Sequence, residues 1–208
     1  MKKEYKIYFL YFLILVYVSG SIGFVMNPTF FSPFTPYTLL FTCFVFLLYN
    51  ASVDKKFVLA FIAIAVFGYI AEVIGVSTGL IFGNYTYGNG LGYKLFNVPL
   101  IISINWALLI CAAIVVMNRF FTKKLSVLLF AAAFVTLLDL LIEQVAPKLD
   151  FWAFENGFPG VHNYIGWMGV ALLTSYVFYP IVIKGNRRVS SVILVFQIVF
   201  FTSLFIFI

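Results

Sequence analysis

The sequence predicts an all-α protein, a polytopic bundle of about seven transmembrane helices. Hydrophobic residues make up 64% of the 208 residues and charged residues only 10%, and the mean hydropathy is +1.10. This composition excludes a soluble globular domain and an intrinsically disordered chain. A transmembrane helix needs about 20 mostly apolar residues. Uncharged runs of sufficient length cover residues 7–53, 73–93, 95–118, 156–183 and 189–208.

The first predicted helix follows the basic residues of segment 1–6 and continues to about residue 24. A signal peptide would also begin with positive charge. However, Ser19-Gly20-Ser21 is a poor cleavage site, so we expect this helix to be retained.

Prolines and short charged segments separate the later helices. Asn27-Pro28, Pro33 and Pro36 interrupt the first long apolar run and predict a turn. Pro99 follows a glycine-rich segment and is expected to restart a helix. We expect the chain to form a single transmembrane domain over residues 1–208. The remaining spans are predicted at about 34–50, 57–75, 99–117, 125–145, 163–183 and 189–208.

The net charge of +6 reflects membrane orientation and not a nucleic-acid partner. With the N-terminus in the cytoplasm and the C-terminus outside, only Lys94 and Lys148 of the lysines and arginines fall in outer segments. The positive-inside rule favours this orientation over its inverse. The basic residues on the inner side are then Lys2, Lys3, Lys6, Lys55, Lys56, Arg119, Lys123, Lys124, Lys184, Arg187 and Arg188.

Carboxylates interrupt the apolar runs in the third and fifth spans. A helix rises about 1.5 Å per residue, so Glu72 lies roughly 24 Å and Asp139 roughly 22 Å from the inner face. Because the hydrocarbon core is about 30 Å thick, both acids belong to its outer half. Glu143 lies one helical turn after Asp139, on the same helix face. Carboxylates inside a membrane are costly and are usually kept for function.

These acids are the predicted catalytic set. Two neighbouring carboxylates in an apolar pocket repel each other and lose hydration, which makes a shared proton favourable. A protonated carboxyl is a strong acid toward a weak base, and an ionised partner can hold and deprotonate water. Hydrogen bonds that merely join helices are the alternative. A magnesium site like that of membrane prenyltransferases would need a second acidic motif and basic phosphate ligands, so we predict no metal site.

Aromatic and amide side chains are predicted at the same depth. The glycine- and tyrosine-rich segment 83–93 follows Glu72, and further tryptophans follow in the fourth and sixth spans. Ring faces stabilise a cation, although an interfacial belt would also collect aromatic residues. The predicted substrate-binding residues are Thr78, Phe82, Tyr85, Tyr87, Asn105, Trp106, Trp152, Asn163, Tyr164 and Trp167.

Two blocks of the chain resemble the integral-membrane carotenoid biosynthesis family, which includes γ-carotene 1′,2′-hydratases and bisanhydrobacterioruberin hydratases. The first block reads EVIGVSTG at 72–79 and FGxYxY at 82–87, with VPL at 98–100 and Trp106 beyond. The second reads LDxxxExVA at 138–146, FWxF at 151–154 and PxxxNYxGW at 159–167. The family often has Asp-Pro where this chain has Glu143-Gln144, so the acid is kept and the proline is not.

The resemblance implies a carotenoid hydratase, a hydro-lyase that adds water to the terminal 1,2 double bond of a linear end such as that of lycopene or γ-carotene. Protonation of this alkene gives a tertiary carbocation, so neither a cofactor nor a metal is expected. The substrate would come from the bilayer of a bacterial or archaeal plasma membrane, and other carotenoid-pathway enzymes are expected partners. No nucleic-acid partner is expected.

Two other functions fit the same residues. A carotenoid end-group cyclase uses the same protonation but closes a ring, and a carotenoid- or lipid-binding membrane protein or transporter would need no acid chemistry. For the hydratase, we predict that Glu72 donates the proton, since it stands alone on its helix before the glycine-rich segment. Asp139 and Glu143, which share a face, would hold and deprotonate the water.

Overall fold

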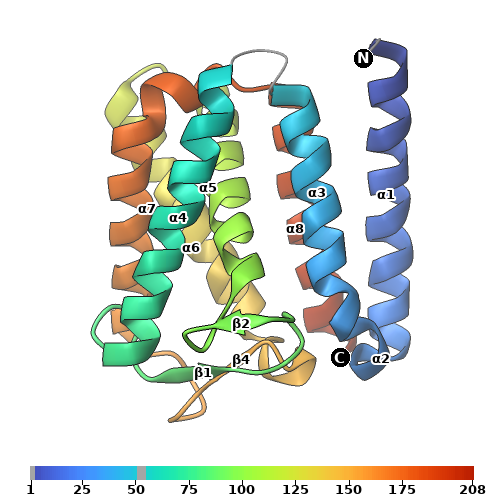
Figure 1. Ribbon diagram of the computed structural model, residues 1–208, viewed down its shortest axis with the longest axis vertical. Coiled ribbons are helices and arrows are strands. Elements are labelled where there is room, and N and C mark those ends of the chain that lie inside the picture. Colours follow the sequence, from blue (N-terminus) through green and yellow to red (C-terminus); the bar gives the residue numbers. More distant parts are fainter. Residues whose placement is uncertain (1–2, 51–54) are drawn as a thin grey trace.

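A computed structural model describes residues 3–50 and 55–208 and confirms an all-α bundle (Figure 1). In this described part, 7 helical segments are long and apolar enough to span a membrane. Residues 1–2 and 51–54, which include the predicted topology signal Lys2, lie outside the described residues. The helices are α1 (Lys3–Met26), α2 (Pro28–Phe31), α3 (Thr35–Asn50), α4 (Lys55–Thr78), α5 (Leu100–Phe120), α6 (Lys124–Glu143), α7 (Val161–Val182) and α8 (Arg187–Phe207).

Helix boundaries coincide with the residues that predict them. The side chain of Asn27 accepts a hydrogen bond from the Phe30 amide at 3.1 Å and caps α2, with Pro28 in the first turn. Asn186 caps α8 in the same way, through the Val189 amide at 3.1 Å. Pro99 is the N-cap residue of α5, as its position after the glycine-rich segment indicates.

Helix α5 forms the centre of the bundle. It packs against α3, α4, α6, α7 and α8, and its middle is buried without interruption from Trp106 to Val115. The alanines Ala107, Ala112 and Ala113 in this stretch let neighbouring helices approach closely. Helix α1 lies at the edge of the bundle (Figure 1), where it packs against α3 and α8.

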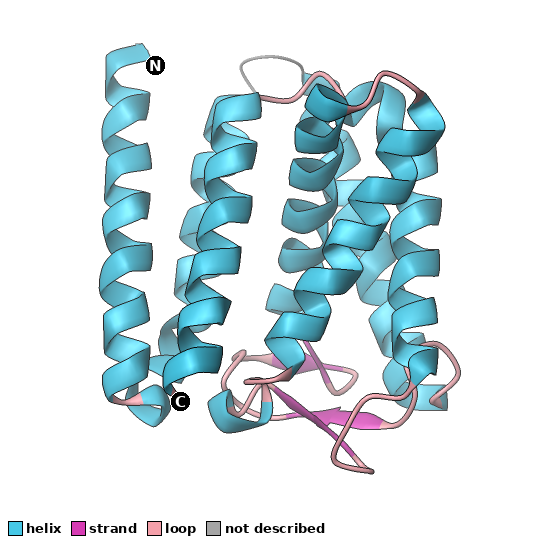
Figure 2. Ribbon diagram, turned by 180° about the vertical axis from the view of Figure 1, so that it is seen from behind, coloured by secondary structure: helices cyan, strands magenta, loops and turns pink. Residues whose placement is uncertain are grey.

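The glycine-rich segment forms short strands that the sequence did not predict. Strand β1 (Tyr85–Tyr87) pairs antiparallel with β4 (Trp152–Phe154), and β2 (Lys94–Leu95) pairs antiparallel with β3 (Val98–Pro99). Figure 2 shows both pairs beneath the helices, at the end opposite the N-terminus. The Gly88 amide donates to the Phe151 carbonyl at 2.9 Å and the Gly90 amide to the Asp150 carbonyl at 2.8 Å. These bonds join the loop after α4 to the loop after α6.

The described chain starts and ends at opposite ends of the bundle, with the C-terminus beside the strands (Figure 1). An odd number of membrane crossings requires this arrangement. Which end faces the cytoplasm remains a prediction from the distribution of basic residues.

Cysteine labelling tests the orientation. Both native cysteines, Cys43 and Cys111, are buried, so they should react little with a membrane-impermeant maleimide. Glu155, after β4, and Lys123, between α5 and α6, are exposed. We expect Glu155→Cys to be labelled on intact cells and Lys123→Cys to be labelled only after permeabilisation. The reverse pattern would place the strands in the cytoplasm.

Candidate active site

The structure brings the three predicted acids to one cavity near the strands. Glu72 comes from α4, and Asp139 and Glu143 come from α6; all three are buried. We call it the acid cavity, and its volume is about 20 Å³. Its lining residues are Glu72, Phe82, Tyr85, Tyr87, Ile102, Asn105, Asp139, Ile142, Glu143, Trp152, Phe154, Asn163 and Trp167.

Glu72 is surrounded by hydrogen-bond donors. The Tyr87 hydroxyl donates to its Oε2 at 2.8 Å, and the Tyr85 hydroxyl donates to the same oxygen. The Trp106 indole nitrogen donates to Oε1 at 2.9 Å. An indole N–H can only donate, so Oε1 of Glu72 is a hydrogen-bond acceptor.

The two tyrosines are suited to remain donors. Burial raises the pKa of both Tyr85 and Tyr87, and the neighbouring Glu72 carboxylate raises it further. A raised phenol pKa means that both side chains keep their protons at neutral pH. Lys94 helps to position the strand, because its Nζ donates to the Tyr87 carbonyl at 2.6 Å.

Asp139 and Glu143 have a different environment. The Asn163 amide donates to Asp139 Oδ2 at 3.3 Å and also to Glu143 Oε1, and the Tyr164 hydroxyl donates to Glu143 Oε2 at 2.8 Å. Because one amide nitrogen contacts both, the two carboxyl groups lie close together inside the protein. Two carboxylates at this distance repel each other, so one proton held by the pair is favourable.

Aromatic rings form one wall of the acid cavity. Trp106 and Trp167 stack at 4.0 Å between ring centroids with 13° between their planes. The Phe82 ring lies 6.3 Å from Trp106 and 6.1 Å from Trp167. Ring faces in such a cluster can stabilise a nearby cation.

Two glycines of α4 make room for this wall. A Cβ at Gly68 would lie 2.7 Å from Trp106, and one at Gly75 would lie 3.1 Å from Phe82 Cε2. Both distances are too short for carbon–carbon contact. The glycines before and after Glu72 therefore let the rings pack directly against α4.

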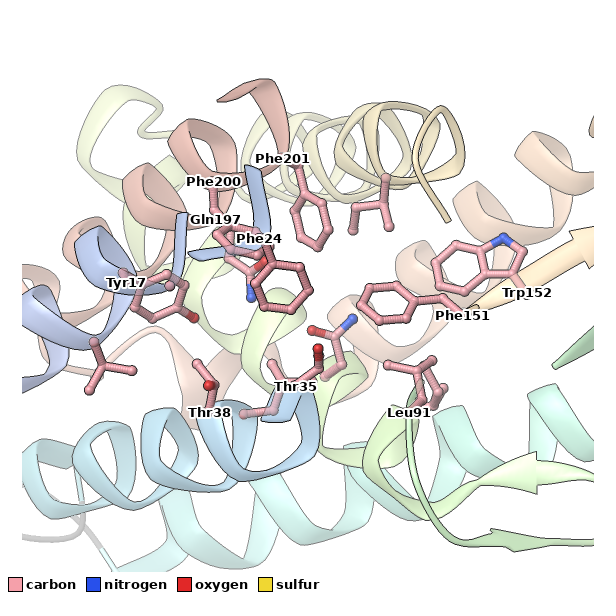
Figure 3. Close-up of a pocket in the computed structure, with 16 residues that line it drawn as sticks. Tyr17, Phe24, Thr35, Thr38, Leu91, Phe151, Trp152, Gln197, Phe200 and Phe201 are labelled. Atoms are coloured by element: carbon pink, nitrogen blue, oxygen red, sulfur yellow. The ribbon is translucent and has the colours of Figure 1, made fainter. Parts of the chain in front are cut away.

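Two further cavities adjoin the acid cavity. A polar one of about 310 Å³ shares Tyr85 and Tyr87 with it and also contacts Asn84, Lys94 and Glu155. We call this the polar vestibule. A mostly apolar one of about 60 Å³, which we call the apolar cavity, lies between α1, α3 and α8 (Figure 3). It shares Ile102, Asn105, Ile142 and Trp152 with the acid cavity.

Most of the predicted substrate-binding residues meet at the acid cavity. Trp106 and Tyr164 contact the acids without lining the cavity. Thr78 lies apart at the exposed end of α4, where its hydroxyl donates to the Ile74 carbonyl at 2.6 Å. Those that line the cavity are Phe82, Tyr85, Tyr87, Asn105, Trp152, Asn163 and Trp167.

Sequence reasoning missed Ile102 and Ile142 in the acid cavity, as well as the contribution of α1, α3 and α8 to the apolar cavity. These side chains are of the same kinds as those that face lipid, so nothing in the sequence distinguishes them.

The chain is similar to proteins of carotenoid biosynthesis. The family model described as "Carotenoid biosynthesis protein" matches residues 34–208. The bisanhydrobacterioruberin hydratase of Haloarcula japonica is 34% identical over 151 residues, which cover 65% of this chain and 50% of the relative. The chain therefore spans about half the length of that curated relative. No solved structure shows significant similarity.

The family match covers every acid of the cavity and all the helices that present them. The acids, the tyrosines after Glu72 and the paired tryptophans are the residues on which the resemblance of the two sequence blocks rests. This chain belongs to the carotenoid biosynthesis protein family.

Proposed function

We propose that this protein is a hydratase that adds water to the terminal 1,2 double bond of a linear carotenoid end, such as that of lycopene. The observation that supports this most directly is a close carboxyl pair, Asp139 and Glu143, in one buried cavity with a second, separate carboxyl group, Glu72. The name of the relative, a hydratase, is consistent with it.

In the first step, the Asp139–Glu143 pair protonates the alkene. The π electrons form a C–H bond at the less substituted carbon, and a tertiary cation remains at the other. The pair is then left with one more negative charge, which Asn163 and Tyr164 accommodate through their hydrogen bonds. The stack of Trp106 and Trp167, beside Phe82, offers the cation aromatic faces within a water-poor cavity.

In the second step, water attacks the cation and Glu72 accepts one of its protons. The polar vestibule supports this step, because it meets the acid cavity at Tyr85 and Tyr87, the two donors to Glu72. The carbon–oxygen bond forms as the water loses its proton. Proton exchange through water then returns Glu72 to a carboxylate and the pair to its protonated form.

These roles reverse the assignment predicted from the sequence, in which Glu72 is the acid. The surroundings of the acids favour the reversal. Three side chains donate hydrogen bonds to Glu72. Asp139 and Glu143 share the Asn163 amide, so they repel each other unless one of them holds a proton. The acid must hold a proton before the reaction, and the base must lack one.

Product analysis tests the reaction itself. The protein is expressed in a bacterium that makes lycopene, and the pigments are separated and weighed by mass spectrometry. We expect a product heavier than lycopene by one water per modified end. A ring-containing product of unchanged mass would instead indicate a cyclase, and lycopene that co-purifies unchanged would indicate a binding protein.

Isosteric variants test the division of roles. We expect Asp139→Asn to abolish every product, because the pair can no longer protonate the alkene. Glu72→Gln should still allow protonation, so the cation would lose a proton elsewhere and give isomerised or cyclised carotenoids. The measurement is the pigment profile at matched amounts of folded protein. If Glu72→Gln stops all conversion and Asp139→Asn gives the side products, the sequence-based assignment is right.

Tyr87→Phe tests the donor arrangement around Glu72. A hydrogen bond to a charged group contributes about 1.5–3 kcal/mol, so its loss should slow hydration by about 10- to 100-fold. Tyr93→Phe is the matched control, because Tyr93 belongs to the same loop and is exposed. Equal rates for the two variants would contradict a role for the Tyr87 hydroxyl.

A further inference from the structure

Much of the apolar cavity is built by helices that do not line the acid cavity. Its walls include Tyr17 and Phe24 of α1, Thr38 of α3, and Phe200 and Phe201 of α8 (Figure 3). Of these three helices, none supplies a residue to the acid cavity. The chemistry of the acids therefore does not explain why these three helices enclose a second cavity.

We propose that the apolar cavity binds the hydrocarbon arm of the isoprenoid substrate while its terminal double bond lies among the acids. This rests on the proposed function and extends it to the part of the substrate that does not react. An alkene end can reach buried acids only if the chain attached to it also has a place in the protein.

The closeness of the two cavities is the first support. Asn105 and Ile102 of α5, Ile142 of α6 and Trp152 of β4 line both of them. The two cavities are therefore neighbours, separated only by these four side chains. The volume of the apolar cavity is about 60 Å³, so the side chains of its walls have to move apart to admit the arm.

The chemistry of the walls is the second support. Phe24, Phe151, Phe200 and Phe201 face the cavity, and polar groups are few. Polyene carbons have no hydrogen bonds to lose on entering such a site, whereas water would lose some of its own. The acid cavity, in contrast, contains three carboxyl groups. The two cavities thus match the two parts of the substrate, an apolar arm and an end that reacts with water.

The position of α1 is the third support. This helix packs on α3 and α8 at the edge of the bundle (Figure 1). Of its most apolar 18-residue stretch, 28% is buried inside the protein. Gly20 of α1 lines the cavity, and a Cβ at this position would meet no atom within 4 Å. A substrate dissolved in the bilayer can reach this cavity sideways between edge helices.

Gly20→Phe tests the proposal by filling the cavity. Gly169 of α7 is the matched control, because it is also a helical glycine with open space around a built Cβ, and it lies in a groove away from both cavities. The substrates are lycopene and a short isoprenoid alkene with the same terminal group. We expect Gly20→Phe to lower lycopene conversion by about tenfold or more and to leave conversion of the short alkene unchanged. Gly169→Phe should convert both like the wild type.

Binding is measured separately from conversion, through the visible absorbance of lycopene retained by each purified protein. If the wild type retains lycopene without hydrating it and Gly20→Phe loses that pigment, the proposed function fails while the arm site stands. If the wild type hydrates lycopene and Gly20→Phe binds and hydrates it equally well, the arm site is wrong while the proposed function stands. Retained conversion of the short alkene shows that Gly20→Phe is folded.

Discussion

A carboxylate buried among apolar helices has to be hydrogen-bonded, and Glu72 imposes this requirement on the rest of the structure. Its donors come from two separate places, Tyr85 and Tyr87 on β1 and Trp106 on α5. The chain after α4 must therefore fold back beneath the bundle. Strand β1 is fixed there by pairing with β4, which follows the helix that contains Asp139 and Glu143. The hydrogen bonds of Glu72 and the pairing of β1 with β4 thus join the two sequence blocks.

The two acidic groups differ because their neighbours differ. Three side chains donate to Glu72. Asp139 and Glu143 instead share the Asn163 amide at close distance, which favours a proton held by the pair. In the proposed reaction, the pair and the separate carboxyl group would supply an acid and a base around one cavity. Sequence spacing gives depth and helix face, but it cannot show which groups donate to which oxygen. For this reason the acids and the side chains around them could be predicted as site residues, whereas the hydrogen bonds between them could not.

Features that depend on local composition could be predicted from the sequence, and features that depend on contacts between distant segments could not. Long apolar runs and breakers such as Pro28 and Pro99 define the helices, because insertion in a membrane depends on local composition. The strands are short and exist through pairing with distant segments, so their own residues give little signal. Thr78 belongs to the first sequence block, yet its hydroxyl bonds to the backbone of α4 at the helix end. Depth alone does not bring a side chain to a site.

The apolar cavity shows why part of a membrane protein's interior escapes sequence analysis. Amides and acids are costly in lipid, so their presence at one depth calls for an explanation. Phe200, Phe201 and Leu39 would be equally suitable against lipid or against the proposed polyene arm, because both surroundings are hydrocarbon. Only the space between α1, α3 and α8 distinguishes the two. The acid cavity could therefore be inferred from residue chemistry, and the apolar cavity only from shape.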